Sequence, residues 1–105
     1  MAIRTMTFRE DEVLKRTIEV LKRYLDPDRI ILFGSRAKQN FSKNSDFDLA
    51  VDKKRVDIRL ERKIREDIEK VSGLYGVDII FLNSVDQIFK KMVLKTGKVI
   101  YERDS

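Results

Sequence analysis

Large apolar residues alternate with aspartate or alanine between Asp46 and Val51, and this alternation is the feature that most constrains the fold. Successive side chains of a β-strand point to opposite faces. The segment is therefore predicted to be a strand with two carboxylates, Asp46 and Asp48, on one face. Ala50 shares the face of the carboxylates, and the other face carries Phe47, Leu49 and Val51.

The rest of the chain divides into segments of helical and strand periodicity. Short apolar runs predict two more buried strands, and apolar residues at helical spacing predict three helices, two of which begin with the spacing of a capping box. The strands are expected at Arg29–Phe33 and Val77–Leu82, and the helices from Thr7 and Glu10 to Leu25, from Leu60 to Val71 before Ser72-Gly73, and from Ser84 and Gln87 to Gly97. The final segment, Lys98–Tyr101, is predicted to be a last short strand or a docking tail.

This order of elements predicts an α/β (α+β) fold in which helices flank a small β-sheet. A length of 105 residues favours one domain over residues 1–105, because two ordinary domains need a longer chain. The sequence leaves open whether the helices cover one face of the sheet or both. It also leaves open whether Arg29–Phe33 and Asp46–Val51 pair in parallel or antiparallel.

The composition restricts the available chemistry. The chain has no cysteine and no histidine, which excludes disulfides, thiolate metal sites and a histidine general base. A formal net charge of +5 favours contact with an acidic partner, such as a nucleotide, RNA or an acidic protein, although a merely solubilising surface explains it equally well. No stretch approaches the roughly 18 apolar residues of a membrane span, so we expect no membrane association and a cytoplasmic location.

A Gly-Ser turn follows the first predicted strand. Gly34 permits a backbone conformation or a close approach that a side chain would block, and amides after it at a helix start would face an anion. Ser35 adds a hydroxyl donor for a phosphate oxygen, and Arg36 would bind phosphate with its guanidinium fork. Lys38 and Lys43 would add positive charge, or serve only solubility. An ordinary strand-to-helix turn capped by Ser35 explains the dipeptide as well.

Three aspartates are candidates for a metal site. Asp46 and Asp48 lie about 6.5 to 7 Å apart on one strand face, from a rise of roughly 3.3 Å per residue. Such carboxylates repel each other unless a cation lies between them, and hard oxygen ligands suit Mg²⁺ that also binds a triphosphate. Asp78 lies in an otherwise apolar strand, and if that strand pairs beside Asp46–Val51 it completes a three-carboxylate cluster. The alternatives are a solvated Asx-turn for the pair and a solvent-facing edge position for Asp78.

Gly34-Ser35, followed by ten residues and then Asp46-Phe47-Asp48, resembles the signature of the polymerase-beta-type nucleotidyltransferases. The surrounding letters GSRA, SDFDLAV and VDII are most similar to the minimal nucleotidyltransferases, also called MNT or MntA-type proteins. The resemblance covers nearly the whole chain. It implies a nucleotidyltransferase palm with a small mixed sheet, Gly34 and Ser35 at the triphosphate, and Mg²⁺ held by Asp46, Asp48 and Asp78. Family members often read GSRARG, whereas Gln39 stands here at the position after Ala37-Lys38.

The resemblance also implies an activity and a partner. A hydroxyl would attack the α-phosphorus of ATP or another NTP, a nucleoside monophosphate, AMP in the case of ATP, would be transferred, and pyrophosphate would leave. The family is known for pairing, as an antitoxin, with a HEPN-domain toxin that carries the acceptor hydroxyl. The alternative is a non-catalytic binding module that neutralises its partner by direct complex formation. Direct RNA binding has only the net charge in its favour, since no base-stacking motif accompanies it.

Overall fold

The computed structural model describes residues 8–38 and 45–104, and these contain every helix and strand that the sequence predicts. In chain order the elements are α1 (Phe8–Leu25), β1 (Arg29–Phe33), the 3₁₀ turn η1 (Gly34–Ala37), β2 (Phe47–Val51), α2 (Ile58–Ser72), β3 (Val77–Phe81), the 3₁₀ turn η2 (Leu82–Ser84), α3 (Gln87–Thr96) and β4 (Lys98–Glu102). The final segment is therefore a strand and not a separate tail.

The four strands form one mixed sheet in the order β3-β2-β1-β4. β1 is antiparallel to both β2 and β4, whereas β2 and β3 are parallel and are joined by the crossover helix α2. The register places Phe33 of β1 opposite Asp48 of β2, and Asp48 opposite Asp78 of β3. The end of β1 and the starts of β2 and β3 thus meet at one edge of the sheet.

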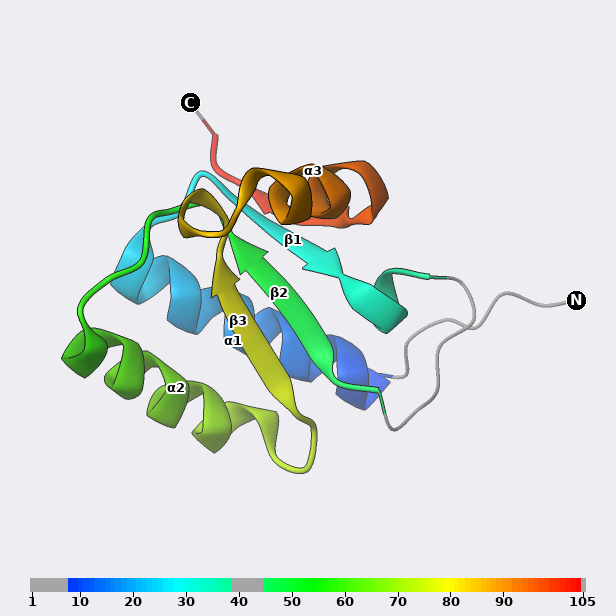
Figure 1. The fold of residues 1–105 in the computed structure, drawn as a ribbon. Coiled ribbons are helices and arrows are strands. Elements are labelled where there is room, and N and C mark those ends of the chain that lie inside the picture. Colours follow the sequence, from blue (N-terminus) through cyan, green and yellow to red (C-terminus); the bar gives the residue numbers. More distant parts are fainter. Residues whose placement is uncertain (1–7, 39–44, 105) are drawn as a thin grey trace, which may run out of the picture.

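Helices cover both faces of the sheet, which answers the question that the sequence left open (Figure 1). α1 and α2 lie together on one face, where Phe47, Leu49 and Val51 are fully buried in the larger core. α3 lies on the other face, where its Val93 packs in a smaller core with Ala50 of β2. The alternation in β2 is confirmed for its apolar residues, because Phe47, Leu49 and Val51 are buried on the face of α1 and α2 and Ala50 is buried on the face of α3. Asp46 immediately precedes the strand.

The predicted start of α3 is wrong. Asp86, not Ser84, is the N-cap, and its carboxylate accepts a hydrogen bond of 2.9 Å from the amide of Phe89. Ser84 instead belongs to η2, and its hydroxyl accepts a hydrogen bond from the amide of Arg55. The short turn between β3 and α3 thus delays the helix by two residues. The predicted end is confirmed, since the amide of Gly97 donates to the carbonyl of Val93.

α1 and α2 pack together on the face of the sheet that carries the larger core. Asp57 caps α2 by accepting from two backbone amides, and Gly73, with φ of +62°, ends it as predicted. Near the C-terminal end of α1, the Tyr24 hydroxyl donates a hydrogen bond to Asp67 of α2. The capping box predicted for α1 includes Thr7, which lies outside the described residues. None of the helices described is long and apolar enough to cross a membrane.

Candidate functional site

The Gly34 turn packs directly against a carboxylate. Gly34 has a φ of +73°, a conformation that favours glycine. A Cβ atom placed on Gly34 would lie 2.3 Å from Oδ2 of Asp48, so any side chain here would displace that carboxylate. Ser35 follows in η1 with its side chain exposed, and its carbonyl accepts the amide of Lys38, which closes the turn. The turn and the carboxylate therefore form one unit.

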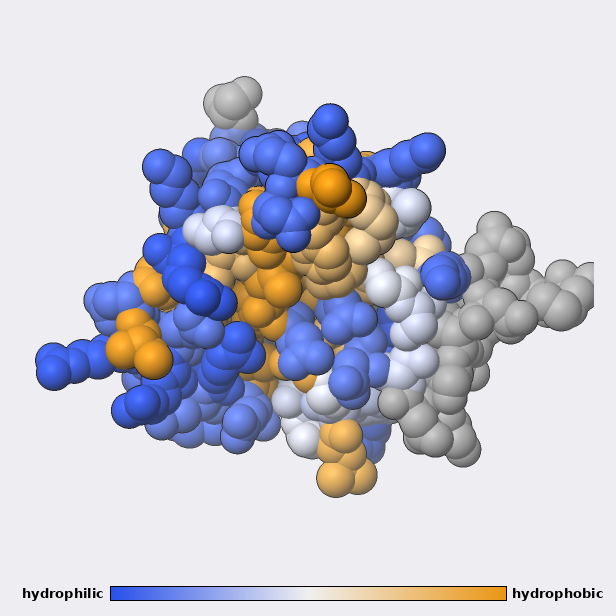
Figure 2. All heavy atoms as spheres, in the orientation of Figure 1, coloured by the Kyte–Doolittle hydropathy of each residue, from blue (hydrophilic) through white to orange (hydrophobic). Residues whose placement is uncertain are grey.

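The three predicted aspartates lie at the same edge of the sheet. Asp46 and Asp78 are exposed, and Asp48 is half-buried between them and Gly34. Burial raises the pKa of Asp48 above its ordinary value, and the negative charges of Asp78 and Asp46 raise it further. Figure 2 shows a hydrophilic surface over the starts of β2 and β3, next to an apolar area below α3. The carboxylates are thus gathered on an accessible surface.

Within residues 8–38 and 45–104, no three acidic side chains converge tightly enough to form a preformed metal cage. The site nevertheless fits a hard cation in its chemistry. Three carboxylates supply the oxygen ligands that Mg²⁺ prefers, and Asp48 carries a charge that its neighbours oppose. A cation bound there would remove this repulsion. Asp78 meets both predictions made for it. It is exposed on the edge strand β3, and it lies opposite Asp48 in the register of β2 and β3.

The Arg36 guanidinium, which was predicted to bind phosphate, does not lie on the surface of the site. The side chain of Arg36 is fully buried, and its Nη1 lies 2.6 Å from Oε2 of Glu10, which is also buried. Its Nε donates a 2.7 Å hydrogen bond to the carbonyl of Ser45. Arg36 points into the protein because α1 presents a carboxylate there, and the spacing of the loop residues alone does not reveal that carboxylate. Lys38 is exposed, while Lys43 and Gln39 lie outside the described residues.

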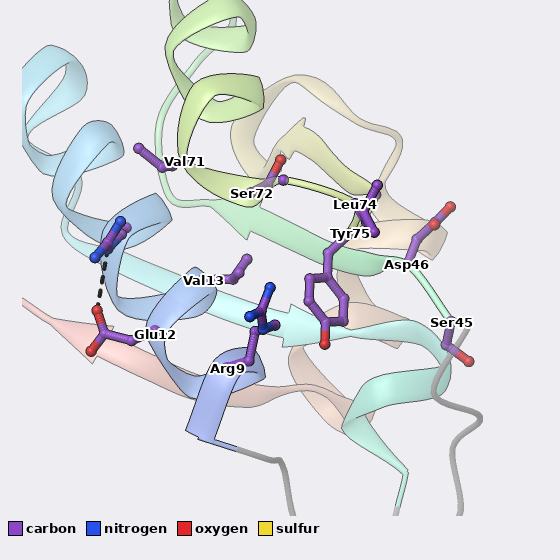
Figure 3. A pocket seen from close by; sticks show the side chains of 12 residues that line it. Arg9, Glu12, Val13, Ser45, Asp46, Val71, Ser72, Leu74 and Tyr75 are labelled. Carbon is purple, nitrogen blue, oxygen red and sulfur yellow. Dashed lines mark hydrogen bonds and ion pairs between the residues drawn. The ribbon is translucent and has the colours of Figure 1, made fainter.

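A pocket of about 640 Å³ opens beside the aspartates, on the side of α1 and α2 (Figure 3). Arg9 and Val13 of α1 form one wall, and Tyr75 lies across from them. Asp46 and Ser45 stand at its edge, so the pocket adjoins the carboxylate site without including Asp48 or Asp78. Gly76 also lines the pocket and leaves room for the carboxylate of Asp46, because a Cβ atom on it would lie 2.3 Å from Oδ1 of Asp46.

Sequence reasoning did not find several residues that shape this region. Three residues that surround Arg36 were not among the candidates. Its guanidinium donates to Glu10 and to the carbonyl of Ser45, and it lies 5.8 Å from the ring centre of Tyr75. Glu10 did carry a signal. It stands on the same helical stripe as the buried residues Val13 and Thr17, and an acidic residue on a buried stripe requires a buried partner.

Comparisons with known proteins identify the family of the chain. The family model described as "Polymerase beta, Nucleotidyltransferase" matches residues 15–105. The protein adenylyltransferase MntA of Aphanizomenon flos-aquae (strain 2012/KM1/D3) is 32% identical over 84 residues, which are 70% of this chain and 55% of that protein. The chain thus spans about half the length of this curated relative.

Solved structures share the fold at lower identity. A crystal structure of a toxin-antitoxin with AMP-PNP aligns with a TM-score of 0.72 at 23% identity, covering 86% of this chain and 73% of that one. A structure described as a minimal nucleotidyltransferase aligns with a TM-score of 0.66 at 21% identity, covering 90% and 97%. The fold and the site define the class as nucleotidyltransferases. This chain belongs to the polymerase beta nucleotidyltransferase family.

Proposed function

We propose that the chain is a Mg²⁺-dependent nucleotidyltransferase that moves AMP from ATP to a hydroxyl on a partner protein. The observation that carries this proposal is the fit of Gly34 against Asp48, which also stands opposite Asp78 in register. One small surface thereby combines backbone amides that bind phosphate with carboxylates that bind a cation. The family membership of the chain supports this proposal.

In this proposal, Gly34 and Ser35 hold the triphosphate of the donor, and Asp46, Asp48 and Asp78 hold Mg²⁺. The ion would neutralise charge on the triphosphate and on the transition state. The acceptor oxygen forms a bond to the α-phosphorus, the bond from that phosphorus to the pyrophosphate oxygen breaks, and Asp78 takes the proton of the hydroxyl. Any contact of Arg36 with the triphosphate is limited to its backbone amide, because its guanidinium is buried.

We infer that the acceptor belongs to a toxin of the HEPN class, with this chain as its antitoxin. The curated relative is named a protein adenylyltransferase, and the solved structures that resemble this fold include toxin-antitoxin complexes. One of those complexes is a mutant with two Asp-to-Glu substitutions two positions apart, the spacing of Asp46 and Asp48. Exposed apolar side chains one turn apart on α3, Ile88 and Met92, also suit contact with another protein.

The test is transfer of label from ATP to the protein that co-purifies with this chain. With Mg²⁺, wild type should label that protein, and Asp46→Asn with Asp48→Asn should not. Glu66→Gln with Glu69→Gln removes the same two charges from the exposed surface of α2 and should transfer like wild type.

Two outcomes would decide against this proposal. Absence of transfer by wild type, or equal transfer by the double aspartate variant, would contradict catalysis at this site. If the double aspartate variant also protects cells from the toxin as well as wild type does, the chain is the alternative, a binding module that acts by complex formation.

A further inference from the structure

A buried ion pair lies directly beneath the candidate site. The side chains of Arg36 and Glu10 are 0% and 1% exposed, and their charged atoms are 2.6 Å apart. Taking two charges out of water is costly, and apolar residues of the same volume often stabilise a fold as well or better. A pair that is this deeply buried therefore calls for a role other than simple stability.

The contacts of Arg36 indicate that role, because they join the three segments that form the site. Arg36 is two residues from Gly34 in the same turn. Its Nε binds the carbonyl of Ser45, which immediately precedes Asp46. Its guanidinium also stacks 4.2 Å from the ring centre of Phe47, the residue between the two aspartates of β2. Glu10 fixes the guanidinium from the side of α1.

We propose that Arg36, oriented by Glu10, is a positioning residue that sets the Gly34-Ser35 turn against Asp46 and Asp48 at the distance that transfer requires. This inference rests on the proposed function for its effect on rate. It assigns Arg36 no contact with nucleotide or metal. The guanidinium acts through Ser45 and Phe47, which hold the start of β2, and it thereby fixes where the carboxylates stand relative to the phosphate-binding turn.

Lysine cannot replace arginine in this arrangement. A guanidinium is planar, donates from several nitrogens in fixed directions and stacks on a ring at the same time. An ammonium at the same position would keep the charge opposite Glu10 but would lose either the Ser45 bond or the stacking on Phe47. Arg36→Lys therefore separates charge balance from positioning, and Glu10→Gln loosens the guanidinium without changing the volume of the site.

The experiment measures kcat and KM for transfer, below the melting temperature, in Arg36→Lys, Arg36→Met and Glu10→Gln. A displacement of about 1 Å at a reacting centre costs on the order of 100-fold in rate, so we expect kcat to fall by about that factor in Arg36→Lys with a small change in KM for ATP. Glu10→Gln should fall by less. Tyr24→Phe is the matched control, because it loosens α1 about 21 Å further along the helix axis, at 1.5 Å per residue.

A second readout is independent of transfer. The amide of Phe47 donates to the carbonyl of Gly76 at the start of β2, and its hydrogen exchange reports how firmly that start is held. Exchange should become faster in Arg36→Lys and stay unchanged in Tyr24→Phe. This readout also decides the outcome if Arg36→Met does not fold.

The results separate this inference from the proposed function. If wild type transfers AMP and Arg36→Lys retains kcat within about threefold with unchanged exchange at Phe47, the positioning role is overturned. It is equally overturned if Tyr24→Phe lowers kcat as much at the same loss of melting temperature. If wild type does not transfer at all, the proposed function fails and the exchange rates alone decide whether Arg36 holds the start of β2.

Discussion

Replacing Gly34 with alanine tests how closely the turn and the carboxylate are fitted. The new Cβ would lie 2.3 Å from Oδ2 of Asp48, whereas ordinary contact begins near 3.4 Å. The overlap of about 1.1 Å, the difference of those two distances, must be relieved by moving the turn or the carboxylate. Alanine would also have to adopt the φ of +73° that glycine adopts at no steric cost.

Two magnitudes follow from this geometry. A left-handed conformation costs an L-residue roughly 1–2 kcal/mol, so the free energy of unfolding should fall by about that amount. A shift of about 1 Å in Asp48 should lower kcat on the order of 100-fold. That factor corresponds to about 2.7 kcal/mol of transition-state stabilisation, which the loss of stability does not account for.

Gly73→Ala supplies the matched control. Gly73 has a φ of +62°, and a Cβ atom on it would meet nothing within 4 Å. A strained positive φ is therefore imposed there without a clash. Urea denaturation should show a loss of stability in both variants, whereas steady-state transfer should show a loss of kcat only in Gly34→Ala. Equal activity losses, or a Gly34→Ala variant within about threefold of wild type, would refute the reasoning.

Two further predictions concern pH. Burial and the charges of Asp78 and Asp46 raise the pKa of Asp48, so ionisation of this carboxyl opposes folding. In EDTA at pH 7, Asp48→Asn should therefore melt at a higher temperature than wild type. This difference should shrink as the pH falls toward 3.8. Added Mg²⁺ should raise the melting temperature of wild type alone, and a higher melting temperature of wild type in EDTA would contradict the account. The hydrogen bond from Tyr24 lowers the pKa of Asp67, so it stabilises the fold above pH 3.8 and its contribution disappears as the pH falls through that lowered pKa. Tyr24→Phe should therefore melt at a lower temperature at pH 7, a deficit that thermal denaturation should find reduced in acid, and an undiminished deficit would argue against the bond.

The strands and their faces were predictable because their pattern is local. A period of two residues fixes which side chains of β2 share a face, whatever lies around the strand. The pairing of β2 with β3 could not be predicted in this way, and it was stated only as the condition under which Asp78 joins the site. The structure satisfies that condition, and the parallel crossover through α2 is what brings the two carboxylates into register.

The burial of the Arg36 side chain was not predictable from its neighbours in sequence. Next to a Gly-Ser turn, an arginine favours a phosphate interpretation, but its carboxylate partner lies 26 residues earlier on α1. The prediction of where α3 starts was wrong for a related reason. Ser84 and Gln87 have the spacing of a capping box, yet η2 uses Ser84, and the helix begins after Asp86. In both cases a tertiary or turn contact decided between two locally acceptable roles.

The central claim is that Gly34, Ser35 and the aspartates form one site for a metal and a triphosphate. The most direct measurement is a crystal structure of the protein, with its partner, in Mn²⁺ and a non-hydrolysable ATP analogue. The account predicts an anomalous Mn²⁺ peak within coordination distance of Asp46 and Asp48, with the phosphates at the backbone amides after Gly34. A nucleotide bound instead in the pocket between α1 and Tyr75, with no metal at the aspartates, would contradict it.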